Sequence, residues 1–148
     1  MSKLADILLD PTLRPELLTA CEGLVDAEVA SKRGLASLPI KGGFKAVKAV
    51  SPAFIRQVVD ALFDRFVEQL EPSYAQWIES GRSGSFGAHL QRHDLAVADA
   101  LLAVTDQRAR QSQMRSVKKV YDKLRPSAQG HVRAGVPRMG QVLDRYVK

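Results

Sequence analysis

The segment Ser51–Leu70, which reads SPAFIRQVVDALFDRFVEQL, constrains the fold of this chain more than any other stretch. Its large apolar residues recur in adjacent pairs every four positions, which places them on one face of a helix and leaves charged residues on the opposite face. Ser51 and Pro52 stand where helices commonly begin, because a serine accepts from free N–H groups and a proline needs no donor there. We therefore expect a core helix that the rest of the chain must cover. Its apolar residues are Phe54, Ile55, Val58, Val59, Leu62, Phe63, Phe66 and Val67.

The other apolar patterns also have helical spacing, and none alternates as a strand would. Pro72 and Pro126 are expected to end helices, because a proline lacks an N–H and clashes with the preceding turn. The sequence thus predicts an all-α fold, a compact single-domain bundle of about seven or eight helices over residues 1–148. Further helices are expected at 2–9, 15–32, 37–50, 73–79, 94–104, 107–125 and 127–134, and after Pro137. On the helix at 107–125, the residues expected to face inward are Met114, Val117, Val120, Tyr121 and Leu124.

The helix expected at 94–104 is apolar almost all round, with Asp99 as the only charge inside it. Such a pattern is typical of a central helix that is contacted on several sides. A charge within it is paired, functional or on the one free edge, and the free edge is the commonest case. We expect Asp99 on that edge.

Charge is distributed unevenly along the chain. Residues 1–106 hold 11 Lys and Arg against 14 Asp and Glu, whereas residues 107–148 hold 11 against 2. Such asymmetry points to an acidic partner, and it also occurs in proteins with a merely solvated basic face. No signal peptide or stretch long enough to span a membrane is visible. The single cysteine, Cys21, lies in an apolar pattern and suits a reducing cytoplasm, so we expect a small buried residue in a cytoplasmic protein.

Two stripes of basic residues are the candidate binding sites for a polyanion. If residues 107–125 form one helix, the basic residues of the first stripe share a narrow outer face with Ser112, which suits contact with a phosphate backbone. No aromatic residue for base stacking lies there, so such binding is expected to be independent of sequence. The alternative is a basic face that only keeps the protein soluble. The stripes are Arg108, Arg115, Lys119 and Lys123, and, on the helix at 37–50, Lys41, Lys45 and Lys48.

Motifs for catalysis or metal binding are missing from the sequence. His89 and His93 are spaced to share a helix face, but a third ligand and the glutamate of the HExxH zinc motif are absent, so we expect two surface histidines and no metal. The flexible loop Gly81–Gly87 does not match a nucleotide-binding fingerprint. No nucleophile elbow or marked pair of carboxylates is present either. We expect no cofactor and no enzymatic activity.

Three segments carry a resemblance to a known family. They read MSKLADILLD at residues 1–10, ALLAVTD at residues 100–106 and KVYDKLRP at residues 119–126. With them the chain resembles, over nearly its whole length, a family of small bacterial all-helical proteins of unassigned function. The resemblance implies a stand-alone, single-domain cytoplasmic protein, and it brings no activity, cofactor or catalytic residue.

Three functions remain open at this point. The first is a non-enzymatic cytoplasmic interaction module that meets a protein partner, or a second copy of itself, through a helical face with an exposed apolar patch of several hundred Å². The second is a weak, sequence-independent nucleic-acid or polyanion binder that uses the basic C-terminal third, and it requires the two basic stripes to converge. The third is a small-molecule binder or enzyme with a pocket under the loop Gly81–Gly87, near Tyr74 and Trp77.

Overall fold

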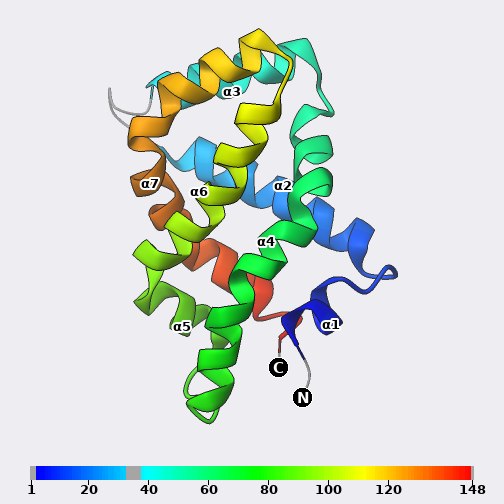
Figure 1. Ribbon diagram of the computed structural model, residues 1–148, viewed down its shortest axis with the longest axis vertical. Coiled ribbons are helices and arrows are strands. Elements are labelled where there is room, and N and C mark those ends of the chain that lie inside the picture. The colour runs from blue at the N-terminus through cyan, green and yellow to red at the C-terminus, as the bar shows by residue number, and fades with distance from the viewer. Residues whose placement is uncertain (1–2, 33–37, 148) are drawn as a thin grey trace.

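A computed structural model describes residues 3–32 and 38–147 of the protein. These residues form seven helices and no strand, which confirms the predicted all-α class. No helix among them has the length and apolar character that a membrane crossing requires. The helices, shown in Figure 1, are α1 (Leu4–Leu8), α2 (Arg14–Ser31), α3 (Leu38–Val50), α4 (Phe54–Glu79), α5 (Phe86–Arg92), α6 (Asp94–Gln111) and α7 (Arg115–Leu143).

Helix α4 is the predicted core helix, but both of its ends differ from the prediction. It begins at Phe54, whose N–H donates to the Ser51 carbonyl in a preceding turn, so the expected capping role of the Ser51 side chain is wrong. It then continues through Pro72 to Glu79, where a break was expected. Tertiary packing explains the continuity, because Tyr74 and Trp77, both beyond the proline, are buried in the core and outweigh its local cost of about 3 kcal/mol.

The predicted helix over residues 107–125 is wrong, because the chain turns in its middle. Helix α6 ends at Gln111 and α7 begins at Arg115. The Met114 N–H donates to Ser112 Oγ at 3.2 Å, a local serine turn that needs neither glycine nor proline. Helix α7 then continues beyond Pro126, where an end was expected.

Helix α7 is long and bent, so it takes part in both ends of the molecule. Figure 1 shows that its first, yellow-orange part crosses the top of the view and its later part runs down to the C-terminus. Pro126 and Pro137 lie inside the helix, and prolines are the usual cause of such bends. The expected separate helices at 127–134 and after Pro137 are therefore parts of α7.

The buried core gathers at the end of the molecule where both chain termini lie (Figure 1). We call residues 4–18, 62–104 and 136–147 the packed end. Its tightest contact joins α5 to α7, because a Cβ on Gly140 would lie 2.8 Å from the Cα of Gly87. Its fully buried large side chains are Leu4, Leu8, Leu17, Val67, Phe86, Leu90 and Val136.

Candidate interaction surface at the basic end

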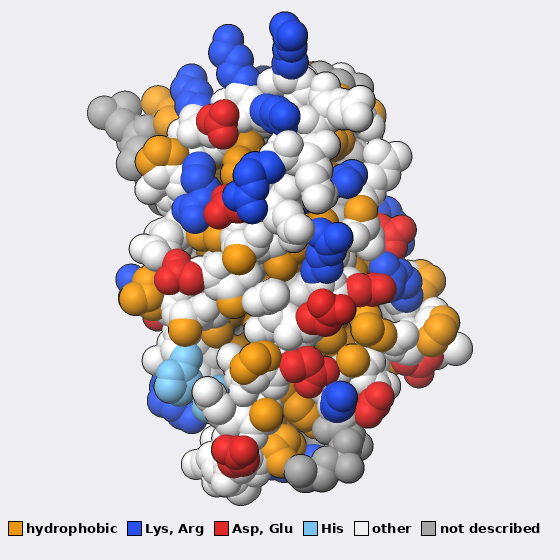
Figure 2. Space-filling view, viewed as in Figure 1, with side chains coloured by type: hydrophobic (Ala, Val, Ile, Leu, Met, Phe, Trp, Pro, Cys, Tyr) orange, Lys and Arg blue, Asp and Glu red, His pale blue; other side chains and the backbone are white. Residues whose placement is uncertain are grey.

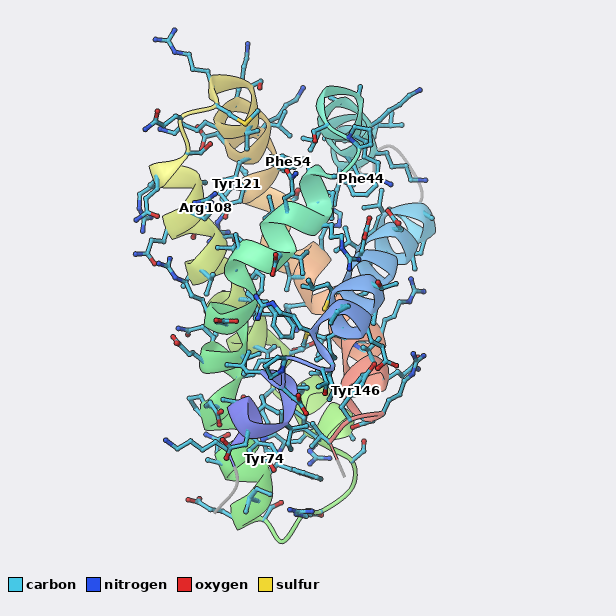
Figure 3. All side chains as sticks on the ribbon, turned by 90° about the vertical axis from the view of Figure 1, so that its right-hand side faces the viewer. Phe44, Phe54, Tyr74, Arg108, Tyr121 and Tyr146 are labelled. Atoms are coloured by element: carbon cyan, nitrogen blue, oxygen red, sulfur yellow. The ribbon has the colours of Figure 1, made fainter. Side chains whose placement is uncertain are left out.

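The opposite end of the molecule is formed by α3, the start of α4, the last turn of α6 and the first part of α7. We call residues 38–61 and 107–125 the basic end. Helix α3 lies beside the first part of α7 (Figures 1 and 3), and a Cβ on Gly43 would come within 2.9 Å of Val120 Cγ1 and 3.2 Å of Leu124 Cδ1. None of the described side chains at this end is buried as the core residues are.

An apolar hollow of about 60 Å³ lies between α3, α4 and α7 at this end. Met114 stands at its rim with 42% of its surface exposed, so the predicted inward position of this residue is wrong. Phe54 and Val117, which also line the hollow, are only half-buried. The hollow is lined by Ala46, Val47, Phe54, Met114, Ser116, Val117 and Val120.

A second, polar hollow of about 520 Å³ lies between α6 and α7, and a hydrogen-bonded network borders it. Arg125 donates from Nε at 2.8 Å and from Nη2 at 3.1 Å to the two carboxylate oxygens of Asp106, and the Tyr121 hydroxyl donates to the same carboxylate. The Arg125 guanidinium holds the pKa of Asp106 below its usual range. Burial and the bond to Asp106 raise the pKa of Tyr121 to about 12, so this hydroxyl keeps its proton at neutral pH.

Basic side chains dominate this end of the molecule. Residues 107–125 hold 7 Lys and Arg against 1 Asp, and α3 holds 3 Lys and no acidic residue. Figure 2 shows these blue side chains gathered over the top of the molecule, whereas red ones are more frequent below. Arg110 of α6 and Lys118 of α7 line the polar hollow together, and sequence reasoning missed both because it placed them on one straight helix.

The first predicted basic stripe is divided between two helices. Arg115, Lys119 and Lys123 are exposed and follow one another at every fourth position of α7, so they share its outer face. Arg108 belongs to α6 and is exposed there, so the expected common face with the other three residues is wrong.

The second predicted stripe lies at the same end but faces another direction. Lys41, Lys45 and Lys48 lie roughly 140–160° around α3 from Gly43, which faces α7. Lys48 is paired with Asp26 of α2 at 2.9 Å and lies 4.6 Å from the ring centre of Phe44. A flat polyanion therefore meets the two stripes from different sides, and binding by these seven residues stays a prediction.

The two histidines occupy different environments, contrary to the expectation that both lie on the surface. His89 is buried, with 6% of its surface exposed, whereas His93 is exposed between α5 and α6. The Nε2 atom of His89 has no hydrogen-bond partner in the part of the chain that the structure describes. Burial, helped by the nearby charges of His93 and Arg92, lowers the pKa of His89. Within those same ranges, no three His, Cys, Asp or Glu side chains group as metal ligands.

The loop predicted at 81–87 is shorter in the structure, because α5 begins at Phe86, and aromatic side chains occupy the place of the suggested pocket. Phe86 is fully buried, and its ring centre lies 5.6 Å from those of Tyr74 and Trp77. Trp77 Nε1 donates to the Gly84 carbonyl at 3.2 Å. These contacts make the loop a cover for the core.

The structure also shows the environments of Asp99 and Cys21, which the sequence singled out. Asp99 is exposed and accepts a hydrogen bond of 2.6 Å from Gln129 Nε2, as expected for the free edge of α6. Cys21 is half-buried, and burial raises the pKa of its thiol to about 11. A thiol with such a pKa stays protonated and is a poor nucleophile at neutral pH.

Comparison with known proteins identifies the family of the chain. No curated protein and no solved structure matches it. A family model, described as a family of unknown function (DUF6918), matches residues 4–147, which include every helix of the structure. The chain therefore belongs to the family DUF6918.

Proposed function

We propose that the protein is a non-enzymatic interaction module that binds a protein partner through its basic end. The apolar hollow beside Met114 carries this proposal. It lies where Phe54, Val117 and Val120 are only half-buried. At the packed end the same two helices, α4 and α7, carry buried apolar residues, among them Val67 and Val136. A partner that covers the hollow removes this remaining apolar surface from water, which is the main source of affinity at protein interfaces.

The other exposed large apolar residues, Leu38 and Leu95, do not line an apolar hollow. Leu95 lies at the start of α6, within the packed end, and Leu38 lies at the first position of α3. Neither residue lines the hollow. Single exposed apolar residues are common on protein surfaces and mark no interface by themselves. The proposal therefore rests on the grouping around Met114.

Site-specific photo-cross-linking tests the proposal. A benzophenone amino acid replaces Met114 in one variant and the exposed Gln76 of α4, at the packed end, in a control variant. Each variant is irradiated in an extract of cells that naturally contain the protein. We expect a discrete protein adduct with the Met114 variant only. Absence of that adduct, or equal adducts from both positions, contradicts the proposal. An adduct with a second copy of the chain identifies self-association as the form of the interaction.

The excess of basic residues at the same end favours a second candidate, a sequence-independent polyanion binder. This candidate is tested by fluorescence anisotropy of labelled DNA and RNA over a salt series. A variant with Arg115, Lys119 and Lys123 changed to Glu is compared with a control that carries Arg92→Glu and Arg145→Glu, both exposed at the packed end. Binding that falls steeply with salt and is lost only in the first variant supports this candidate. No binding at low salt rejects it.

A further inference from the structure

We infer that the partner segment is an acidic amphipathic helix that lies along the first part of α7. It inserts one bulky aliphatic side chain into the apolar hollow and sets carboxylates against Arg115, Lys119 and Lys123. This inference rests on the proposed function, because it specifies the partner of the same surface. The shape, the charge and the length of this surface each support such a partner.

The surface of α7 between residues 115 and 125 is divided into three strips. Successive residues are about 100° apart around a helix, which places the basic ridge of Arg115, Lys119 and Lys123 between the two hollows. Ser116 and Val120 face the apolar hollow on one side of this ridge. Lys118 and Asp122 face the polar hollow on the other side. A segment that lies along the ridge therefore reaches the apolar hollow with one of its own edges.

The apolar hollow is suited to a single side chain. Its volume of about 60 Å³ is smaller than the cavities of about 150 Å³ that hold a benzene ring, and larger than one water requires. Met114 at the rim has a flexible thioether side chain, which adapts to partners of different shape. The end of one leucine or isoleucine side chain fits these dimensions.

The cations of the ridge are available to a partner. Arg115, Lys119 and Lys123 take part in none of the ion pairs within residues 3–32 and 38–147. Elsewhere in the molecule, basic residues are commonly paired, as Arg14 is with Asp60 and Asp64 at 2.9 and 2.8 Å. Carboxylates of a partner complement the ridge, whereas basic segments are repelled by it.

An acidic helix accounts for the surface better than a nucleic acid does. The phosphate groups of a nucleic acid are charged and do not fill an apolar hollow. Its bases stack only on exposed aromatic faces. The aromatic residues here are half-buried: Phe54 lines the hollow, Phe44 lies beside Lys48, and the Tyr121 hydroxyl is bonded to Asp106. The ridge spans about 12 Å along α7, which a partner helix of about three turns covers. Helices that lay an apolar face in a groove are a common form of peptide recognition.

A competition experiment with synthetic probes tests the inference. The probe is a fluorescein-labelled helical peptide of about 14 residues, built from alanine, glutamate and one central leucine. Two matched peptides carry Leu→Ala or Glu→Gln changes. We expect the probe to bind and to compete with the Met114 photo-adduct, and each matched peptide to bind at least about tenfold more weakly.

Two protein variants locate the binding site of the probe without disturbing the core. Met114→Glu places a charge at the rim of the hollow and is expected to weaken binding by about tenfold or more. Leu95→Glu is the control, because Leu95 lies away from the hollow and has 46% of its surface exposed, close to the 42% of Met114. This change is expected to leave binding of the probe unchanged. Equal effects of these two changes overturn the inference.

The outcomes separate the inference from the proposed function. One outcome is that the adduct at Met114 forms, but the acidic probe neither binds the protein nor prevents the adduct. This outcome overturns the inference of an acidic helix and leaves the proposed interaction module in place. Equal binding of the leucine and alanine peptides overturns the role of the hollow and favours the polyanion binder. Absence of any adduct at Met114 removes both the inference and the proposed function.

Discussion

The packed end and the basic end share the helices α4, α6 and α7, but the two ends bury their apolar residues to different degrees. On α4, Leu62 and Phe63 are buried, whereas Phe54 and Ile55, two turns earlier, are half-buried. On α7 the contrast has the same direction, since Val136 is buried and Val120 is not. One continuous helix can therefore hold the fold together at one end and leave apolar and charged groups accessible at the other.

The two ends also differ in what their glycines contact. At the packed end, Gly87 and Gly140 bring two backbones together, and the Gly87 N–H donates to Asp144 Oδ1 at 2.8 Å. At the basic end, Gly43 faces only the ends of the Val120 and Leu124 side chains. Side-chain ends can shift, whereas a backbone can shift only with its whole helix. We therefore expect the packed end to be the more rigid of the two.

The largest expected effect comes from removing a core aromatic side chain. We expect Phe86→Ala to lower the free energy of unfolding by about 3–5 kcal/mol, because it empties the space between Tyr74 and Trp77. Phe54→Ala, at the basic end, is expected to cost only about 1–2 kcal/mol because that ring is half-exposed. Urea denaturation measures both values, and equal losses would contradict the difference between the ends.

A comparison of three glycines on the helices sharpens the same contrast. Gly140→Ala is expected to destabilise by about 2–3 kcal/mol, because the added Cβ meets the backbone of Gly87. Gly130→Ala, on the same helix with nothing within 4 Å of the added Cβ, is expected to stabilise by about 0.5–1 kcal/mol. Gly43→Ala should lie between the two, since its neighbours are side-chain ends. If Gly43→Ala were the most destabilising of the three changes, the basic end would be more tightly packed than the packed end, contrary to our interpretation.

The buried His89 predicts a dependence of stability on pH. Its pKa is lowered in the folded protein, so the folded chain binds this proton more weakly than the unfolded chain does. Stability is therefore complete above the ordinary histidine pKa of about 6.5 and falls as the pH drops through the lower, folded value. We expect the urea midpoint to fall less between about pH 7.5 and about pH 5.5 in His89→Leu than in the wild type.

His131 supplies the internal comparison for this pH effect. Burial and the nearby Lys32 also lower its pKa, so His131→Gln should remove a further part of the dependence on pH. The double variant should be the least sensitive of the series. An unchanged fall of the midpoint in His89→Leu would show that other groups cause the acid sensitivity.

The smallest expected effect on stability is that of the charge reversals on the ridge. Arg115→Glu, Lys119→Glu and Lys123→Glu should each change the free energy of unfolding by less than about 0.5 kcal/mol, because the three side chains are exposed and form no ion pair within the described residues. The same variant serves in the binding experiments, so its thermal unfolding should be recorded first. A large loss of stability would show that the ridge has a structural role.

Local sequence patterns predicted the class of the fold and the position of its core helix. The four-residue recurrence around Leu62 and Phe63 requires a helix with one buried face, and α4 buries both residues. The same pattern cannot show that Phe54 is less covered than Phe63, because burial depends on which other helices reach that part of the face. Prolines misled the prediction, since Pro72, Pro126 and Pro137 lie inside helices whose packing outweighs their local cost.

The candidate surface was predictable only in its charge. An excess of basic residues after residue 106 is visible in the sequence, and the structure places many of them at one end. The turn at Ser112 carries no glycine or proline, so nothing local indicated that Arg108 and Arg110 belong to a different helix from Arg115. Met114 was expected in the core because it continues an apolar pattern, and the turn places it at the surface instead.

The position of both chain termini at the packed end has a practical consequence for handling the protein. Leu4 and Val147 both pack into the core of the packed end, and Figure 1 places both termini at this end, far from α3. The carboxylate of Glu71 also accepts from the Leu4 N–H at 3.0 Å, which fastens the first helix to α4. A tag, fluorophore or fused domain on either terminus is thus held away from Met114. Attached to a sensor surface by such a tag, the protein would present its basic end to the solution.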